Sequence, residues 1–240
     1  MNSDSLKERV DLLIKEHEED PFRREIELKK LLKQAEKSSN VYCIGFINFH
    51  LAFCIFQQGK RGSMLPYSYK AVKIFEKMND KTALARSYNL MGIVYAGEEN
   101  FQAALFSYFK ALDLIRGKRM AGIRKETLLN NIGDSYYQMG AYQKSLSISL
   151  KCLSGCKKNN PENHRSIVLY GLNTADNYCC LNEFQQAKQT LQSIAESANQ
   201  LQKCSLLSAY YARCAWVSYA TGDAETGARN ADQCLEMIAS

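Results

Sequence analysis

The chain has 240 residues, 46% of them hydrophobic, which is enough for a folded core. No run of about eighteen apolar residues occurs, and the first residues, MNSDSLKERVD, lack the apolar segment of a secretory signal, so we expect a cytoplasmic protein that does not cross a membrane. The net charge of +6 is modest and spread along the chain, so we expect no nucleic-acid partner.

Residues 4–38 are predicted to form one helix pair, divided at Asp20 and Pro21. An Asp side chain accepts hydrogen bonds from the first amides of a helix, and Pro is tolerated in the first turn because its missing N–H has no partner there. This pair does not fit well the pattern of small and large residues that recurs in the rest of the chain. We therefore interpret residues 1–40 as an N-terminal capping helix pair.

Residues 85–117 define the unit that recurs in the rest of the chain. They are predicted to form two amphipathic helices with a tight break at residues 97–100. Gly92 and Ala104 leave room for two antiparallel helices to approach closely, and larger side chains fill the space around them. The helix faces are Tyr88, Met91, Gly92 and Tyr95 in the first helix, and Phe101, Ala104, Tyr108 and Ala111 in the second.

The same pattern recurs at intervals of 40 to 42 residues, at Gly133, Ala175 and Ala215, with an upstream copy at Ala52. Its order of aromatic, Leu-Gly, Tyr, Ala and Phe positions resembles the tetratricopeptide repeat (TPR). The resemblance covers about residues 41–240. It implies an all-α fold, a right-handed α-solenoid of about five TPR-like helix pairs that follow the N-terminal pair. The expected repeats are 41–80, 81–119, 120–160, 161–201 and 202–240.

The repeat length exceeds the roughly 34 residues of the standard TPR, so we expect longer helices. In the first repeat Pro66 predicts a late start of the second helix, with Ser63 as its N-cap. Asn160 and Pro161 are expected to begin the fourth repeat. The last helix presents apolar residues without a following cap. We interpret this edge as continued by further chain or covered by a partner, which includes self-association through the C-terminal edge.

Catalytic and metal-binding patterns are absent from the sequence. The nine cysteines and three histidines lack the paired spacing of zinc sites, so we expect reduced, mostly buried thiols, no metal and no cofactor. No phosphate-binding loop, nucleophile elbow or His-Glu-x-x-His motif occurs, and we expect no enzyme active site in these residues. Two basic groups, residues 117–125 and 155–160, fall at repeat junctions and are interpreted as charges that stabilise helix C-termini.

The TPR resemblance implies that the first helix of each pair lines a concave surface. An asparagine at these positions offers both an acceptor and a donor, so it can bond the backbone of an extended peptide of any sequence. The alternative is that these asparagines bond only to neighbouring helices. The expected ligand-binding residues are Arg86, Asn89, Asn130, Asn131, Asp134, Tyr137, Asn173, Asp176, Arg213, Trp216 and Tyr219.

Two groups at the ends of this surface have simpler interpretations. Trp216, Tyr219 and Arg213 form an aromatic, basic corner that packing between the last repeats would also explain. The aromatic row Phe46, Phe49 and Phe53 is interpreted as core.

The resemblance implies a non-catalytic TPR module that binds a peptide or protein segment. The repeats are similar to the N-terminal TPR region of bacterial GGDEF diguanylate cyclases, where such a module is the regulatory input region of a larger signalling protein. Two alternatives are a peptide-pheromone receptor-like regulator and a free-standing protein-protein interaction scaffold.

Overall fold

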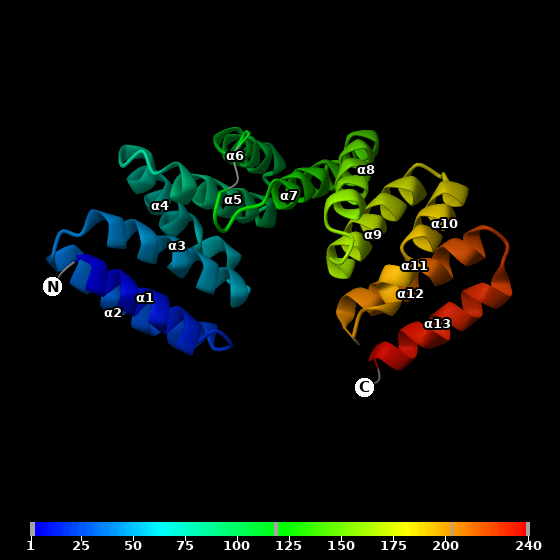
Figure 1. Ribbon diagram of the computed structural model, residues 1–240, viewed down its shortest axis with the longest axis horizontal. Helices are drawn as coiled ribbons and strands as arrows, with labels where there is room; N and C mark the ends of the chain where they lie inside the picture. The colour runs from blue at the N-terminus through cyan, green and yellow to red at the C-terminus, as the bar shows by residue number, and fades with distance from the viewer. Residues whose placement is uncertain (1–2, 118–119, 203, 239–240) are drawn as a thin grey trace. The chain divides into compact units, whose positions relative to one another are not determined.

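The computed structural model describes residues 3–117, 120–202 and 204–238. Over these residues the chain forms α-helices α1 to α13 and one short 3-10 helix, with an isolated bridge between Met120 and Ile123 in place of any strand. The all-α prediction is confirmed. The chain divides into two compact units, residues 1–128 and 129–240, and each is described by itself (Figure 1).

Unit 1 is built from successive antiparallel helices, in which α3 packs against α2 and α4, and α5 packs against α4 and α6. Its buried core includes Leu28, Ile47, Leu51 and Phe75. Its helices are α1 (Ser3–Glu16), α2 (Pro21–Lys37), α3 (Val41–Gln57), η1 (Arg61–Ser63), α4 (Leu65–Lys77), α5 (Lys81–Gly97) and α6 (Phe101–Leu114).

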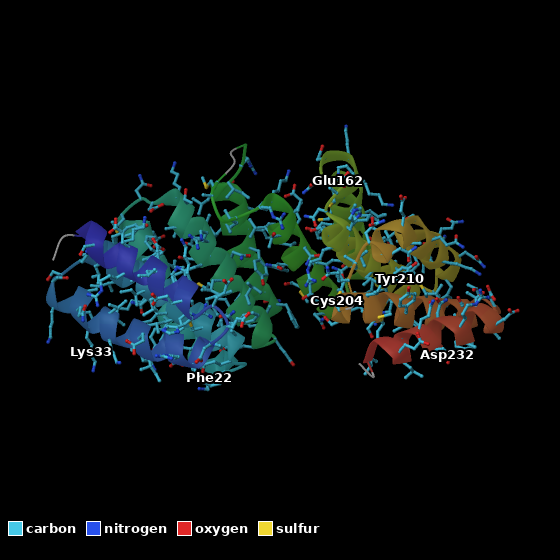
Figure 2. All side chains as sticks on the ribbon, turned by 60° about the horizontal axis from the view of Figure 1, so that its bottom comes forward. Phe22, Lys33, Glu162, Cys204, Tyr210 and Asp232 are labelled. Carbon is cyan, nitrogen blue, oxygen red and sulfur yellow. The ribbon has the colours of Figure 1, made fainter. Side chains whose placement is uncertain are left out.

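Unit 2 has the same plan, with α9 in contact with α8, α10 and α12, and α12 packed on α13. Its core includes Val168, Ala187 and Tyr210, the last of which is labelled in Figure 2. Its helices are α7 (Lys125–Gln138), which begins at the end of unit 1, α8 (Tyr142–Asn159), α9 (His164–Cys180), α10 (Phe184–Ser193), α11 (Ala195–Asn199), α12 (Ser205–Ala220) and α13 (Ala224–Ile238).

A recurring three-residue connection turns one helix into the next. Between α5 and α6, Glu99 has a φ of 59° and the Asn100 amide donates to the Tyr95 carbonyl at 2.9 Å, which closes the end of α5. The Asn100 side chain then accepts from the Ala103 amide and caps α6. The same form recurs at Asn182 between α9 and α10, so the break predicted at residues 97–100 is confirmed.

Glycines allow the closest helix contacts. A Cβ on Gly92 would lie 2.4 Å from the ring of Tyr108, which confirms the close approach expected between α5 and α6. A Cβ on Gly171 would lie 2.6 Å from Ile194. At Gly133 the approach is looser than expected, because the nearest atom, Ile148 Cγ2, is 3.4 Å away and only in ordinary contact.

Two predicted helix starts need correction. Asp20 caps α2 through the Arg23 amide as expected, but Ser63 does not cap α4, because η1 occupies residues 61–63 and Met64 precedes the helix. Asn160 ends α8, and Asn163 caps α9 by accepting from the Ser166 amide at 3.1 Å. The helix start predicted at Ser63 lies one residue before the observed N-cap Met64, and the start predicted at Asn160 lies three residues before the observed N-cap Asn163.

The long repeat is accommodated in more than one way. Helix α8 has 18 residues, as longer helices predict, whereas α6 has only 14. Near the end of α8, Lys157 Nζ donates to the Ser193 carbonyl of α10 at 2.8 Å, which confirms a helix-end role in the 155–160 group. In the other basic group, Lys118 and Arg119 lie outside the described residues.

The nine cysteines are all free thiols, and five of them are buried. Within the described ranges, no helix combines the length and the apolar character that crossing a bilayer requires.

Candidate functional site

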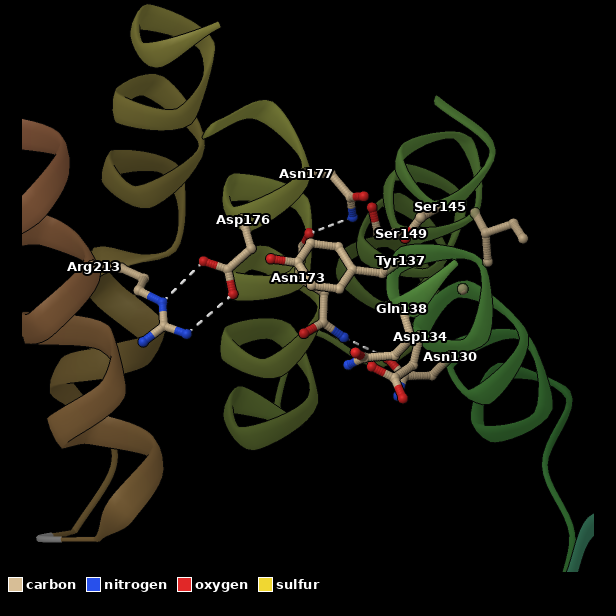
Figure 3. A pocket seen from close by; sticks show the side chains of 12 residues that line it. Asn130, Asp134, Tyr137, Gln138, Ser145, Ser149, Asn173, Asp176, Asn177 and Arg213 are labelled. Carbon is tan, nitrogen blue, oxygen red and sulfur yellow. Dashed lines mark hydrogen bonds and ion pairs between the residues drawn. The ribbon is translucent and has the colours of Figure 1, made fainter. Parts of the chain in front are cut away.

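Unit 2 contains a hollow of about 240 Å³, shown in Figure 3, whose walls come from α7, α8, α9 and α12. Six of the residues expected from the sequence line it, because α7 and α9 present positions three or four residues apart on one face. These six are Asn130, Asp134, Tyr137, Asn173, Asp176 and Arg213. The other lining residues are Gly133, Gln138, Ser145, Ile148, Ser149 and Asn177.

Asn130 and Asn173 lie opposite each other on neighbouring first helices. Asn173 Nδ2 donates to Asn130 Oδ1 at 2.8 Å, and both residues are half-buried (Figure 3). This bond links α7 to α9. In this one case an asparagine does bond to a neighbouring helix, as the alternative interpretation of the sequence expects. A carboxamide has further donor and acceptor capacity after one such bond.

Asp176 on α9 and Arg213 on α12 form an ion pair beside this asparagine pair. Arg213 Nε donates to Asp176 Oδ1 at 2.9 Å and its terminal nitrogen donates to Oδ2 at 3.3 Å, a two-point contact. The hydrogen bond to Asp176 raises the pKa of Arg213. Its charge is matched in place, so the basic character expected at this corner of the groove is largely neutralised.

Asp134 is the second carboxylate of the hollow. Asp134 as a whole residue is exposed to solvent, but many protein atoms surround its carboxyl group within the hollow. This partial desolvation raises the pKa of the Asp134 carboxyl, and a hydrogen bond with Gln138 opposes the shift.

Tyr137 is held at the rim by contacts from two helices. The Cys180 thiol donates to the Tyr137 hydroxyl at 3.4 Å, and the rings of Tyr137 and Tyr142 meet edge to face with centroids 5.4 Å apart. The pKa of Tyr137 is raised, first by the contact with Cys180, then by burial and by nearby Asp176. The phenol therefore stays neutral and can donate a hydrogen bond.

The remaining expected residues lie outside this hollow. Trp216 packs edge to face on Phe184 with ring centroids 6.1 Å apart, and both Trp216 and Tyr219 are about half-exposed. Asn131 is half-buried on α7. In unit 1, Arg86 on α5 lies over the ring of Phe49, 4.8 Å from its centroid, and Asn89 is half-buried on the same helix.

Sequence reasoning missed the polar residues deeper in the hollow. Ser145, Ser149 and Asn177 are buried, and they lie between helices rather than on the groove face. Asn177 follows Asn173 by four residues, so it shares a side of α9 with the asparagine that the sequence did identify. That spacing was the available signal.

No family model and no curated protein matches the chain. Solved structures of TPR-like proteins do match it. BtubC from P. vanneervenii has 16% identity over 99% of this chain and 89% of its own, with a TM-score of 0.70. A putative kinesin light chain from Podosopora anserina with nearly identical TPR-like repeats has 16% identity over 80% and 93%, with a TM-score of 0.65.

A third structure, NprR in complex with its cognate peptide NprX, has 14% identity over 97% of this chain and 67% of its own, with a TM-score of 0.64. At these identities the likeness concerns the fold. It defines an α-solenoid of paired helices, and the helix pairs are TPR-like repeats. The predicted fold class is confirmed.

Proposed function

We propose that this chain is a non-catalytic TPR module that binds an extended peptide or protein segment along the hollow of unit 2. The observation that carries the proposal is the bonded pair Asn130 and Asn173. Their mutual bond uses one donor of Asn173 and one acceptor position of Asn130. Asn130 Nδ2 is then available to donate, and Asn173 Oδ1 to accept.

A peptide backbone supplies the complement of this pair. Each peptide unit carries one N–H donor and one C=O acceptor, so one extended residue can accept from Asn130 and donate to Asn173. The bond between the two asparagines fixes both carboxamides before the ligand arrives, which lowers the entropy lost on binding. The pair therefore recognises the backbone and leaves sequence preference to the surrounding pocket.

Two further observations support the proposal. The Asp176–Arg213 pair and the neutral Tyr137 give the wall a polar, hydrogen-bonding character. Among structures of similar fold, NprR was solved with a bound peptide.

The double change Asn130→Ala with Asn173→Ala tests the proposal directly. Against a peptide selected from a random library on the purified chain, we expect affinity to fall about thirtyfold, since two hydrogen bonds of about 1 kcal/mol each are lost. Both members of the internal bond are removed together, so the melting temperature should move by less than about 4 °C. Isothermal titration and thermal unfolding measure the two quantities.

The matched control is Gln143→Ala with Gln189→Ala, which removes two exposed carboxamides from α8 and α10. This control should bind the peptide as tightly as the unchanged chain. If the double asparagine variant binds the peptide as tightly as the unchanged chain, Asn130 and Asn173 do not bind the peptide.

We propose further, from the resemblance of the repeats to those before GGDEF domains, that the module is the regulatory input of a cytoplasmic diguanylate cyclase. The peptide-pheromone receptor and the free-standing scaffold are the alternatives. Reading the gene past the codon for Ser240 separates them. A GGDEF domain there supports the input role, and an immediate stop codon contradicts it.

Self-association through the C-terminal edge is also proposed. Leu235 and Ile238 on α13 are 64% and 69% exposed, the two largest exposed fractions among the large apolar side chains of the described residues. Leu235→Lys is expected to weaken a dimer at least tenfold by placing a charge in the interface. Leu12→Lys on α1, 56% exposed, is the control. Sedimentation that shows a monomer at every concentration contradicts the proposal.

A further inference from the structure

We propose that the hollow ends in a slot for the carboxamide side chain of a Gln or Asn residue in the bound segment. The slot is defined by Gly133, Ser145, Ser149 and Asn177, and it lies where α7, α8 and α9 meet (Figure 3). This inference rests on the proposed peptide-binding function and specifies its side-chain preference.

Asn177 places a buried hydrogen-bond acceptor at the end of the hollow. The residue is 1% exposed, and its Nδ2 donates to the Asn173 carbonyl at 2.6 Å. That bond fixes which end of the carboxamide is the nitrogen. Oδ1 is buried and has no hydrogen-bond partner among the described residues, so it is an acceptor that a bound N–H group can satisfy.

The two serines on α8 define the rest of the slot. The Ser149 hydroxyl donates to the Leu146 carbonyl at 3.1 Å, which leaves its oxygen as an acceptor. The Ser145 hydroxyl can rotate to donate or to accept. In the view of Figure 3 the Asn177 carboxamide is turned to the side on which Ser149 lies, and all three residues line the hollow.

Gly133 supplies the room. A Cβ there would be 3.4 Å from its nearest neighbour, whereas at Gly92 and Gly171 it would be 2.4 and 2.6 Å away. A methyl group therefore fits at Gly133 in ordinary contact with Ile148 on α8, so the two helices approach less closely here than at Gly92 or Gly171. The whole hollow measures about 240 Å³, below the roughly 300–1,000 Å³ of pockets that enclose an entire small ligand. It suits one side chain of a longer segment.

A primary carboxamide matches these groups in full. Its two N–H donors serve Asn177 Oδ1 and Ser149 Oγ, and its carbonyl accepts from Ser145. A carboxylate brings only acceptors and leaves Asn177 unsatisfied. An ammonium brings a charge whose burial among neutral groups is unfavourable, and an aliphatic side chain offers no donor. The slot therefore prefers Gln or Asn over Glu, Lys and Leu.

The experiment titrates the ¹⁵N-labelled full chain with the diamide N-acetyl-glutamine-N-methylamide, followed by the glutamate and leucine analogues. We expect the Asn177 side-chain amide and the Gly133 backbone amide to shift with the glutamine diamide at least tenfold more readily than with the others. Equal shifts with all three, or shifts with none, overturn the slot.

Gly133→Ala provides the variant, because its methyl group narrows the slot and meets Ile148 on α8 at an ordinary contact distance of 3.4 Å. It should raise the melting temperature by about 2 °C, since Ala is favoured over Gly within helices, and abolish the glutamine shifts. Gly155→Ala in α8, where a Cβ meets nothing within 4 Å, should give the same stabilisation and keep the shifts. Shifts that survive in Gly133→Ala also overturn the slot.

The two proposals fail separately. Suppose that a selected peptide loses affinity in the double asparagine variant but shows no preference for Gln or Asn at any position. That result contradicts the carboxamide slot and leaves the proposed peptide-binding groove intact. If the double asparagine variant binds the peptide with unchanged affinity, the proposed groove is contradicted, whether or not the glutamine diamide causes shifts.

Discussion

Acidification from pH 6.5 to 4.5 should lower the free energy of opening of α3 by about 2–3 kcal/mol through His50. Burial, with Arg86 and then Arg24 nearby, lowers the pKa of His50 from 6.5 to about 3. Its Nε2 is buried without a partner among the described residues, although the residue as a whole keeps some exposed surface. The neutral ring lies between Phe46 and Phe49, edge to face with both.

The direction of the effect follows from proton uptake. Between pH 6.5 and about 3 the unfolded chain binds a proton at His50 that the folded chain does not, so stability falls as the pH falls through this range. Above pH 6.5 the contribution is fully present. Hydrogen exchange of α3 peptides in the full chain at several pH values measures it.

His50→Leu should flatten the pH dependence of α3, whatever it does to absolute stability. His164→Leu changes a histidine of unit 2 and should leave the slope in α3 unaltered. If the slope of α3 in His50→Leu equals that of the unchanged chain, His50 is not the group responsible.

Gly92→Ala is expected to destabilise the α5–α6 pair by about 2 kcal/mol. The new methyl would be 2.4 Å from the ring of Tyr108, which is itself buried and cannot retreat. Overpacking of this kind costs roughly 1–3 kcal/mol, which outweighs the roughly 0.5–1 kcal/mol by which Ala favours a helix. Faster hydrogen exchange in α5 and α6 would report the loss.

The glycine series gives this prediction its control. Gly155→Ala makes the same chemical change in a helix with open space around the new methyl and should be neutral or stabilising. Slowed exchange in α5 of Gly92→Ala would show that the close approach to Tyr108 is not needed for the α5–α6 contact.

The sequence predicted features that depend on periodicity. The break near Glu99 and the pairing of Gly92 with Tyr108 follow from residues that repeat about every 41 positions. Six of the expected residues line the hollow, because the position of a residue within the repeat fixes the helix face on which it lies. The division into a capping pair and five repeats stays a prediction.

Features set by contacts between repeats could not be predicted in the same way. Asp176 and Arg213 are 37 residues apart, and nothing local indicates that their charges meet. Asn177 lies one residue beyond the groove face, and only the packing of α8 beside α9 shows that its Oδ1 has no partner. The starts of α4 and α9 were misplaced because proline restricts a helix start without fixing it.

The central claim is that Asn130 and Asn173 bind a peptide backbone. Its most direct test is to titrate the ¹⁵N-labelled chain with the selected peptide and follow the side-chain amides of asparagine and glutamine. We expect saturable shifts at Asn130 and Asn173, with Gln143 and Gln189 unmoved. Saturable binding that leaves both asparagine amides unmoved would contradict it.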